Sequence, residues 1–358
     1  MSEVRLLKPE EMGLGERVQM FEDGLRTEQR SGSYEWWYFD SKYPDGSSLV
    51  IVFFTKHVTS FVGKYKPYVS LNYINPNGRE LRTELWSDDY SFSKDCCDVR
   101  IGDCHVKGDL SHYEIHFKNS DAECHVTLDA SVPSWRPESG HIYFGKKDYF
   151  AWLPSVPEGR MNGTLKMGDE TVELCGTGYH DHNFGNKLMI LLMNDWYWGR
   201  AKIGDYVVVS SYIYANKKDG YKQTPIFMLA RDGEILTGDA AKHLKYEEKD
   251  FVKDSYTKRH VAKTLVYDYN DAENGIHYRV TYKKGDEEVE RQVMTDIVGR
   301  PLAIMFYLLG FRGSYHRMGG VAILERFDGD EVVERIEAPA MWEQMCFKPD
   351  RIKGKNVK

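Results

Sequence analysis

Short stretches in which apolar and polar residues alternate recur along the whole chain. In residues 113–117 and 125–128 every second side chain is apolar, which is typical of a β-strand that buries one face. This alternation, or a short run of β-branched and aromatic residues, predicts strands at 49–55, 68–74, 80–86, 112–117, 125–130, 206–214, 263–269, 276–282, 321–327 and 332–338. No long amphipathic helix pattern stands out, and residues 239–249 are predicted to form a short helix or a loop.

Asn-Gly and Asp-Gly dipeptides separate many of these stretches, at 45–46, 77–78, 219–220, 232–233, 274–275 and 328–329. Both dipeptides tolerate the positive φ angles that tight β-hairpins require. Regular short strands joined by such turns predict an all-β protein made of antiparallel sandwiches or barrels.

An aromatic strand, a turn and a very apolar strand occur together twice. The first copy is 37–39, 45–46 and 49–54, and the second is 196–198, 204–205 and 206–209. The repeat predicts two β-domains of similar size, at 1–195 and 196–347, although aromatic strands before turns also occur without duplication. Five basic residues in 348–358 predict a basic, disordered tail.

Composition narrows the class of protein. The 358 residues carry 48 basic and 55 acidic side chains, and a net charge of −7 argues against nucleic-acid binding. The 24 Tyr, 16 Phe and 8 Trp can fill a sizeable core. The longest apolar run, 302–311, is well short of the roughly 20 residues of a spanning helix. Without an apolar signal stretch we expect a cytoplasmic protein with six reduced cysteines, and we leave peripheral membrane contact and the oligomeric state open.

The densest group of polar residues lies in 176–185, Gly-Thr-Gly-Tyr-His-Asp-His-Asn-Phe-Gly. On a strand, His180 and His182 share one face, but no companion ligand motif is nearby, so we expect no metal. The glycine spacing does not match a phosphate-binding loop. Tyr179, Asp181 and Asn183 share the other face, where burial would raise the pKa of Asp181 and make it a proton donor. The alternative is a structural polar cluster that pins a turn.

Two aromatic strands add candidate ligand contacts. Trp36 and Tyr38 share a face in the first strand, and Trp196, Trp198 and Arg200 share a face in the second. These rings either pack in the core or line a pocket for a large apolar ligand. Aromatic faces also stabilise a cation, by roughly 0.5–2 kcal/mol.

Four motifs occur in order: 35–40 (EWWYFD), 150–154 (FAWLP) with Gly163, 176–185, and 196–200 (WYWGR). Together they resemble the lipocalin-like carotenoid 1,2-hydratase (hydroxyneurosporene synthase) and AttH superfamily, which includes kievitone hydratases and fungal decalin-forming Diels–Alderases. The resemblance implies two lipocalin-like (calycin) antiparallel β-barrel domains side by side and cofactor-free chemistry on isoprenoid- or polyketide-like molecules. It maps the proposed proton donor of the hydratases to Asp181, beside Tyr179. Their upstream His-x-Trp element appears here with Phe150 in place of the histidine, followed by Trp152.

We therefore expect an enzyme, a hydratase, dehydratase or isomerase that acts by acid catalysis on a C=C bond of a large hydrophobic small molecule, without a metal or organic cofactor. The alternatives are a pericyclase or cyclase acting on a polyene, and a non-catalytic carrier of an apolar ligand. The expected catalytic residues are Asp181, Tyr179 and His180. The expected substrate-binding residues are Trp36, Tyr38, Trp152, His182, Asn183, Trp196, Trp198 and Arg200.

Overall fold

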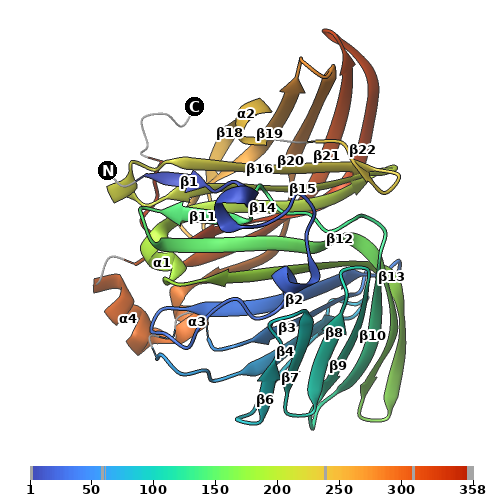
Figure 1. Ribbon diagram of the computed structural model, residues 1–358, viewed down its shortest axis with the longest axis vertical. Coiled ribbons are helices and arrows are strands. Elements are labelled where there is room, and N and C mark those ends of the chain that lie inside the picture. Colours follow the sequence, from blue (N-terminus) through green and yellow to red (C-terminus); the bar gives the residue numbers. More distant parts are fainter. Residues whose placement is uncertain (1–2, 58–59, 61, 238–239, 309–310, 353–358) are drawn as a thin grey trace. The chain divides into compact units, whose positions relative to one another are not determined.

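The computed structural model describes residues 3–352 except 58–59, 61, 238–239 and 309–310. The chain separates into two compact units. The N-terminal unit comprises Leu6–Tyr143 and Lys147–Leu188, and the C-terminal unit comprises Met1–Arg5, Phe144–Lys146 and Met189–Lys358. Each unit is built on an antiparallel β-sheet (Figure 1), which confirms the predicted all-β class. The change of unit after Leu188 lies just before the predicted boundary at 195.

The first sheet has the strand order β5-β4-β3-β2-β13-β12-β10-β9-β8-β7-β6, and β11 pairs with both β1 and β12. Its strands are β1 (Val4–Leu6), β2 (Tyr34–Lys42), β3 (Ser48–Phe54), β4 (Tyr68–Ile74), β5 (Glu80–Trp86), β6 (Tyr90–Phe92), β7 (Cys97–Ile101), β8 (Cys104–Gly108), β9 (His112–Lys118), β10 (Glu123–Ala130), β11 (His141–Phe144), β12 (Asp148–Met167) and β13 (Glu170–Gly185). Two 3₁₀ turns, η1 (Pro9–Met12) and η2 (Met20–Asp23), precede β2.

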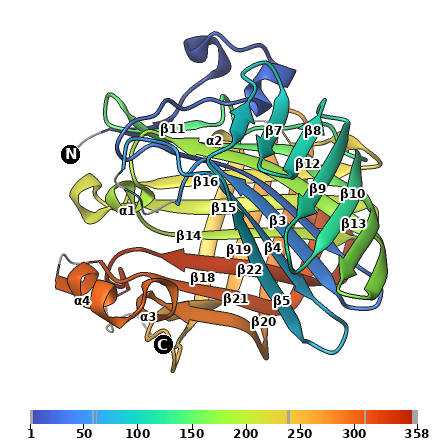
Figure 2. The same ribbon diagram turned by 90° about the horizontal axis from the view of Figure 1, so that it is seen from below.

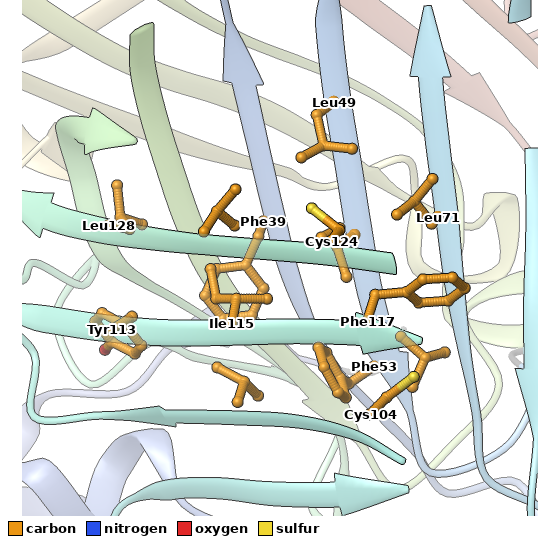
Figure 3. Close-up of a cluster of buried hydrophobic side chains, with 14 of the residues drawn as sticks. Phe39, Leu49, Phe53, Leu71, Cys104, Tyr113, Ile115, Phe117, Cys124 and Leu128 are labelled. Atoms are coloured by element: carbon orange, nitrogen blue, oxygen red, sulfur yellow. The ribbon is translucent and has the colours of Figure 1, made fainter. Parts of the chain in front are cut away.

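This sheet curls around its own core. Side chains from β2, β3 and β4 meet side chains from β8, β9 and β10 in one buried cluster, as Figure 3 shows for Phe39, Leu49 and Phe117. Near one rim, Thr83 in β5 donates a hydrogen bond to Asp121 in the β9–β10 turn at 2.6 Å. The two halves of the strand order therefore fold toward each other, and one core serves both.

The second sheet has the order β17-β16-β15-β14-β22-β21-β20-β19-β18. Its strands are β14 (Met193–Ile203), β15 (Tyr206–Ala215), β16 (Gln223–Arg231), β17 (Glu234–Ile235), β18 (Leu244–Lys253), β19 (His260–Asp271), β20 (Ile276–Val293), β21 (Ser314–Asp328) and β22 (Glu331–Cys346). Short helices lie between strands: α1 (Met189–Leu192), η3 (Lys217–Asp219), α2 (Ala240–His243), α3 (Met294–Val298) and α4 (Arg300–Leu308). Its core is rich in large aromatic side chains, among them Tyr197, Tyr282 and Trp342.

All ten strand ranges predicted from the alternating pattern lie within or overlap observed strands. Both aromatic repeats form hairpins, β2–β3 and β14–β15. The expectation of a short helix or loop at 239–249 holds for 240–243, which form the helix α2, and is wrong for 244–249, which begin the strand β18; residue 239 lies outside the described part of the chain. The apolar run 302–311 contributes to α4, and in the described residues no helix has the length and apolar character to cross a membrane.

The start of the predicted tail is ordered. Arg351 donates hydrogen bonds to both oxygens of Asp195, at 3.0 and 3.1 Å, and to both oxygens of Glu248, at 2.6 and 2.7 Å. Its guanidinium also lies over the ring of Tyr214 at 3.5 Å. The expectation of disorder is therefore wrong for this residue, because two buried carboxylates need a cation. Residues 353–358 lie outside the described part of the chain.

Gly163 allows β12 to approach β10 closely. A Cβ atom at this position would lie 1.9 Å from the carbonyl oxygen of His125, so the strands would have to separate. We expect Gly163→Ala to lower the free energy of unfolding by roughly 3 kcal/mol, in the range of a severe backbone clash, as measured by urea denaturation. Gly15→Ala is the control, since its nearest neighbour is 3.9 Å away. Equal stability of the two variants would contradict this account.

The ion-pair cluster of Arg351 generates a second prediction. Arg351→Gln leaves Asp195 and Glu248 buried without their cation, so we expect the C-terminal unit to lose about 3–5 kcal/mol of stability. Thermal unfolding monitored by circular dichroism would measure the loss. Arg335→Gln is the matched control, because Arg335 forms a half-exposed pair with Glu337 and its loss should cost no more than about 1 kcal/mol.

Candidate active site

The polar segment 176–185 forms the end of β13, in the middle of the first sheet. β13 pairs with β12 on one side and with β2 on the other. Its last eight residues, 178–185, are all buried. Because side chains alternate along a strand, Tyr179, Asp181 and Asn183 lie on one face and the two histidines on the other. Both faces are covered, so every polar side chain in this stretch needs a partner.

Asp181 receives three hydrogen bonds from side chains. The indole N–H of Trp152 and the hydroxyl of Tyr179 donate to Oδ2 at 2.7 and 2.8 Å, and the amide of Asn183 donates to Oδ1 at 2.6 Å. Trp152 comes from β12, where it lies directly opposite Asn183. We call these four residues the Asp181 cluster. The side chains that the sequence places on one face of the strand are therefore joined by hydrogen bonds, and Trp152 joins them from the neighbouring strand β12.

Burial raises the pKa of Asp181 from its ordinary value of 3.8 to about 6, because an apolar environment penalises the carboxylate. The hydrogen bonds from Trp152, Tyr179 and Asn183 act in the opposite direction, since they favour the anion. Asp181 can therefore exchange a proton near neutral pH. Its contribution to stability is present below pH 4 and is lost as the pH rises through about 6.

Aromatic rings surround this face. Tyr38 lies opposite Asp181 in β2 and contacts the ring of Tyr179 edge-on, with 6.4 Å between centroids. Trp135 contacts Trp152 in the same manner at 6.5 Å. Trp36 lies opposite Asn183 and stacks on Tyr34, with 5.6 Å between their rings. Trp36 and Tyr38 are only partly buried, so their rings have surface left to contact a ligand.

His180 and His182 lie on the opposite face and are fully buried. The nitrogens of His180 lie 2.9 Å from the carbonyl oxygen of Tyr38 and 3.1 Å from Asp23 Oδ2. Those of His182 lie 3.2 Å from the carbonyl oxygen of Glu22 and 2.8 Å from Glu35 Oε1. Every nitrogen of the two rings therefore lies close to an oxygen atom of a neighbouring segment. The geometry favours a structural role for both, with η2 as the segment they hold.

Asp23 is the residue at this site that sequence reasoning missed. Although burial disfavours its carboxylate, the charge and hydrogen bond of His180 lower the pKa of Asp23 below its ordinary value. Tyr113 donates to Asp23 Oδ2 at 2.6 Å, and Trp37 donates to its backbone oxygen at 2.8 Å. No spacing or periodicity links position 23 to position 180. Only the acidic 3₁₀ turn before the aromatic strand could have suggested it.

Asp23, Cys97 and His180 bring metal-ligand types within 4.8 Å of one another. Burial raises the pKa of the Cys97 thiol well above its ordinary value, so the thiolate form that binds metals is disfavoured. The Asp23 carboxylate already accepts hydrogen bonds from Tyr113 and His180. This group therefore fits a hydrogen-bonded core better than a metal centre.

A cavity of about 260 Å³ lies in the N-terminal unit. Ala151, Leu153 and Phe184 line it, and they alternate with Trp152 and Asn183, which places the cavity over the histidine side of the sheet. Its other lining residues are Met12, Leu14, Phe21, Glu22, Arg26, Arg136, Ser139, Gly140, His141, Tyr149 and Trp152. Trp152 thus borders the cavity and also belongs to the Asp181 cluster.

The remaining predicted ligand contacts lie in the other unit. Trp196, Trp198 and Arg200 are part of β14, in the C-terminal unit. Trp196 packs against Phe347, with 5.1 Å between their rings, and Arg200 is buried. Their contact with substrate remains a prediction.

Known proteins share the sequence pattern. The sequence model of the Diels-Alderase-like family matches residues 27–347. A curated relative from Chlorobaculum tepidum, named hydroxyneurosporene dehydrogenase, is 28% identical over 214 residues, which cover 48% of this chain and 54% of that protein. The match therefore spans about half the length of each protein.

Known structures share the fold. CghA, solved with Sch210972, superposes with a TM-score of 0.63 at 13% identity, covering 93% of this chain and 96% of CghA. Kievitone hydratase of Nectria haematococca superposes with a TM-score of 0.54 at 10% identity, with the same coverage of 93% and 96%. At these identities the likeness shows the fold alone. With the family match, it confirms the resemblance that the four motifs indicate.

The hydrogen bonds to Asp181 yield a direct test. Trp152→Phe removes a donor that favours the carboxylate, so we expect the pKa of Asp181 to rise above about 6. The pH dependence of the carboxyl ¹³C resonance of Asp181 would measure it. Trp135→Phe is the control, since Trp135 contacts Trp152 through its ring and should leave this pKa in place. An unchanged or lower pKa in Trp152→Phe would refute the assigned hydrogen bond.

Proposed function

This chain belongs to the Diels-Alderase-like family, and on that premise we propose that it is an enzyme acting on a carbon–carbon double bond of a large hydrophobic small molecule. The reaction is hydration, dehydration or isomerisation by acid catalysis, and Asp181 is the proton donor. The observation that carries the proposal is the Asp181 cluster: a buried carboxyl with a pKa of about 6, three hydrogen-bond donors and an aromatic surround.

In the proposed reaction the carboxylic acid of Asp181 transfers its proton to one alkene carbon. The π electrons form the new C–H bond, which leaves a carbocation on the substrate and a carboxylate on Asp181. The N–H of Trp152, the O–H of Tyr179 and the amide of Asn183 stabilise that carboxylate as it forms, because they are already oriented toward it. Proton transfer therefore needs no rearrangement of distant groups.

The fate of the cation decides the product. Water attacks it and returns a proton to the carboxylate in hydration, whereas a neighbouring C–H loses its proton to the carboxylate in isomerisation. The partly exposed faces of Trp36 and Tyr38 would stabilise the cation, by roughly 0.5–2 kcal/mol. His180 is a positioning residue in this scheme, since it bonds the carbonyl of Tyr38, the residue opposite Asp181.

A pericyclic reaction on a polyene is the second candidate, and the family description favours it. Such a reaction needs a shaped site and a few hydrogen bonds rather than an acid. Trp152 and Tyr179 would then orient Asp181, which would hydrogen-bond a polar group of the substrate. No carbon atom of the substrate would gain a proton from the enzyme.

Product analysis in D₂O separates the two candidates. We expect an acyclic isoprenoid or polyketide polyene to gain one C–D bond on turnover, with the added mass of water if hydration occurs. Asp181→Asn should abolish this product, because an amide cannot deliver the proton, and its melting temperature should stay close to that of the wild type. The rate should fall as the pH rises through about 6, where Asp181 loses its proton.

Asp129→Asn is the control, because Asp129 is a half-exposed carboxyl on β10 that pairs with His112 and its loss should leave the rate unchanged. A cyclised product without deuterium, formed equally by Asp181→Asn, would replace the acid mechanism with the pericyclic one. Tight binding of the polyene without any turnover would identify a carrier.

A further inference from the structure

Three histidines lie side by side on the outer face of the first sheet. His105 in β8 lies opposite His116 in β9, and His116 lies opposite His125 in β10. Figure 2 shows these three strands as neighbours. The residues next to them in sequence, such as Ile115 and Val126, belong to the buried core, so the alternation of the strands turns the histidines outward.

Glu123 adds a carboxylate to this row. It precedes His125 by two positions in β10 and therefore shares its face. Its Oε1 atom lies 3.6 Å from Nε2 of His116 and 3.6 Å from Nε2 of His125. The two imidazole rings stack, with 3.9 Å between centroids and 18° between planes. Two ring nitrogens thus converge on one carboxylate oxygen.

The Nε2 atom of His116 is buried and has no hydrogen-bond partner among the described residues. The 3.6 Å separation from Glu123 is too long for a hydrogen bond. A buried polar atom without a partner costs free energy, in the range of roughly 1–3 kcal/mol. This nitrogen points toward a position that a ligand could fill.

The spacing of the three atoms fits a metal ion. They all lie within 4.8 Å of one another. A tetrahedral zinc ion with bonds of about 2.0–2.2 Å keeps its ligands about 3.4 Å apart, close to the two separations of 3.6 Å. We propose that His116, His125 and Glu123 form a binding site for Zn²⁺ or a similar divalent transition metal, with water in the fourth position.

The donor set selects the class of metal. Two imidazole nitrogens and one carboxylate oxygen suit Zn²⁺, Cu²⁺ and Ni²⁺, whereas Mg²⁺ and Ca²⁺ prefer oxygen ligands throughout. Lys118 lies 3.1 Å from Glu123 Oε1 and competes for the carboxylate. Its side chain is 49% exposed, so it can turn into solvent at little cost.

A second cluster shows by contrast what makes this one suitable. Asp254, Glu288 and His316 also lie within 4.8 Å of one another, but Arg291 bonds Asp254 and Lys284 bonds Glu288. Those buried or half-buried cations already neutralise both carboxylates. At the His116–His125–Glu123 site the competing cation is an exposed lysine, and metal binding there would tie β9 to β10 on the side away from the core.

Zinc titration of the metal-stripped protein tests the site. Calorimetry with ZnCl₂ should show one Zn²⁺ bound per chain in the micromolar range or tighter, and saturation should raise the melting temperature by roughly 5 °C. His125→Gln and Glu123→Gln should each weaken binding at least tenfold and remove the thermal shift. Both side chains are at least one-third exposed, so the variants should fold, which circular dichroism would verify.

His112→Gln is the matched control, because His112 lies on the same face of β9 but pairs with Asp129 at 2.6 Å, and zinc binding should be unchanged. MgCl₂ should bind to none of these proteins at the same concentration. The proposal is overturned if the wild type takes up no Zn²⁺ at about 1 mM. It is equally overturned if His125→Gln and Glu123→Gln bind Zn²⁺ as the wild type does, since the metal would then lie elsewhere.

Discussion

The burial of both faces of β13 is the constraint on which the rest of the site depends. A strand in the middle of a sheet that carries Tyr, His, Asp, His and Asn in succession has no water with which to satisfy them. Alternation separates these side chains into an acidic face and a basic face, and each face must be completed by other segments. Removing one member of a buried charged pair costs about 3–5 kcal/mol, so these completing segments are held firmly.

The basic face explains the path of the chain before β2. The apolar side chains of η2, Met20 and Phe21, stay exposed, yet its Asp23 is fully buried against His180 and Tyr113, and Glu22 is buried against Arg136. These ion pairs hold the segment over the end of the curled sheet. Burial raises the pKa of Asp181, because the neutral donors around it offset the burial only in part, whereas at Asp23 burial is outweighed by the charge and hydrogen bond of His180 and the pKa falls. Two aspartates in one unit thereby acquire opposite protonation behaviour from their neighbours.

Alternation and short apolar runs predicted ten of the strands, the aromatic repeats with their turns predicted two hairpins, and strand geometry predicted the shared face of Tyr179, Asp181 and Asn183, whereas β7, β8 and β16 were not predicted. Alternation could not predict the roles of Asp23 and Arg351, because these residues lie in a 3₁₀ turn and beyond the last strand, and their partners His180 and Asp195 are distant in sequence. It also missed β18, whose residues are largely polar and exposed, so its strand geometry comes from pairing with β19 rather than from burial. Trp152 was predicted only from the family resemblance, because the strand register that places it opposite Asn183 becomes known only from the folded structure.

The three donors around Asp181 differ in one respect that matters once the carboxyl holds a proton. The indole N–H of Trp152 can only donate, whereas the hydroxyl of Tyr179 and the amide of Asn183 can each reverse and accept. A neutral carboxyl has a hydrogen to donate, so in the absence of a bound alkene one of these two groups can turn around to accept it. Trp152 keeps the same orientation in both protonation states, whereas the orientation of Tyr179 or Asn183 depends on whether Asp181 carries the proton.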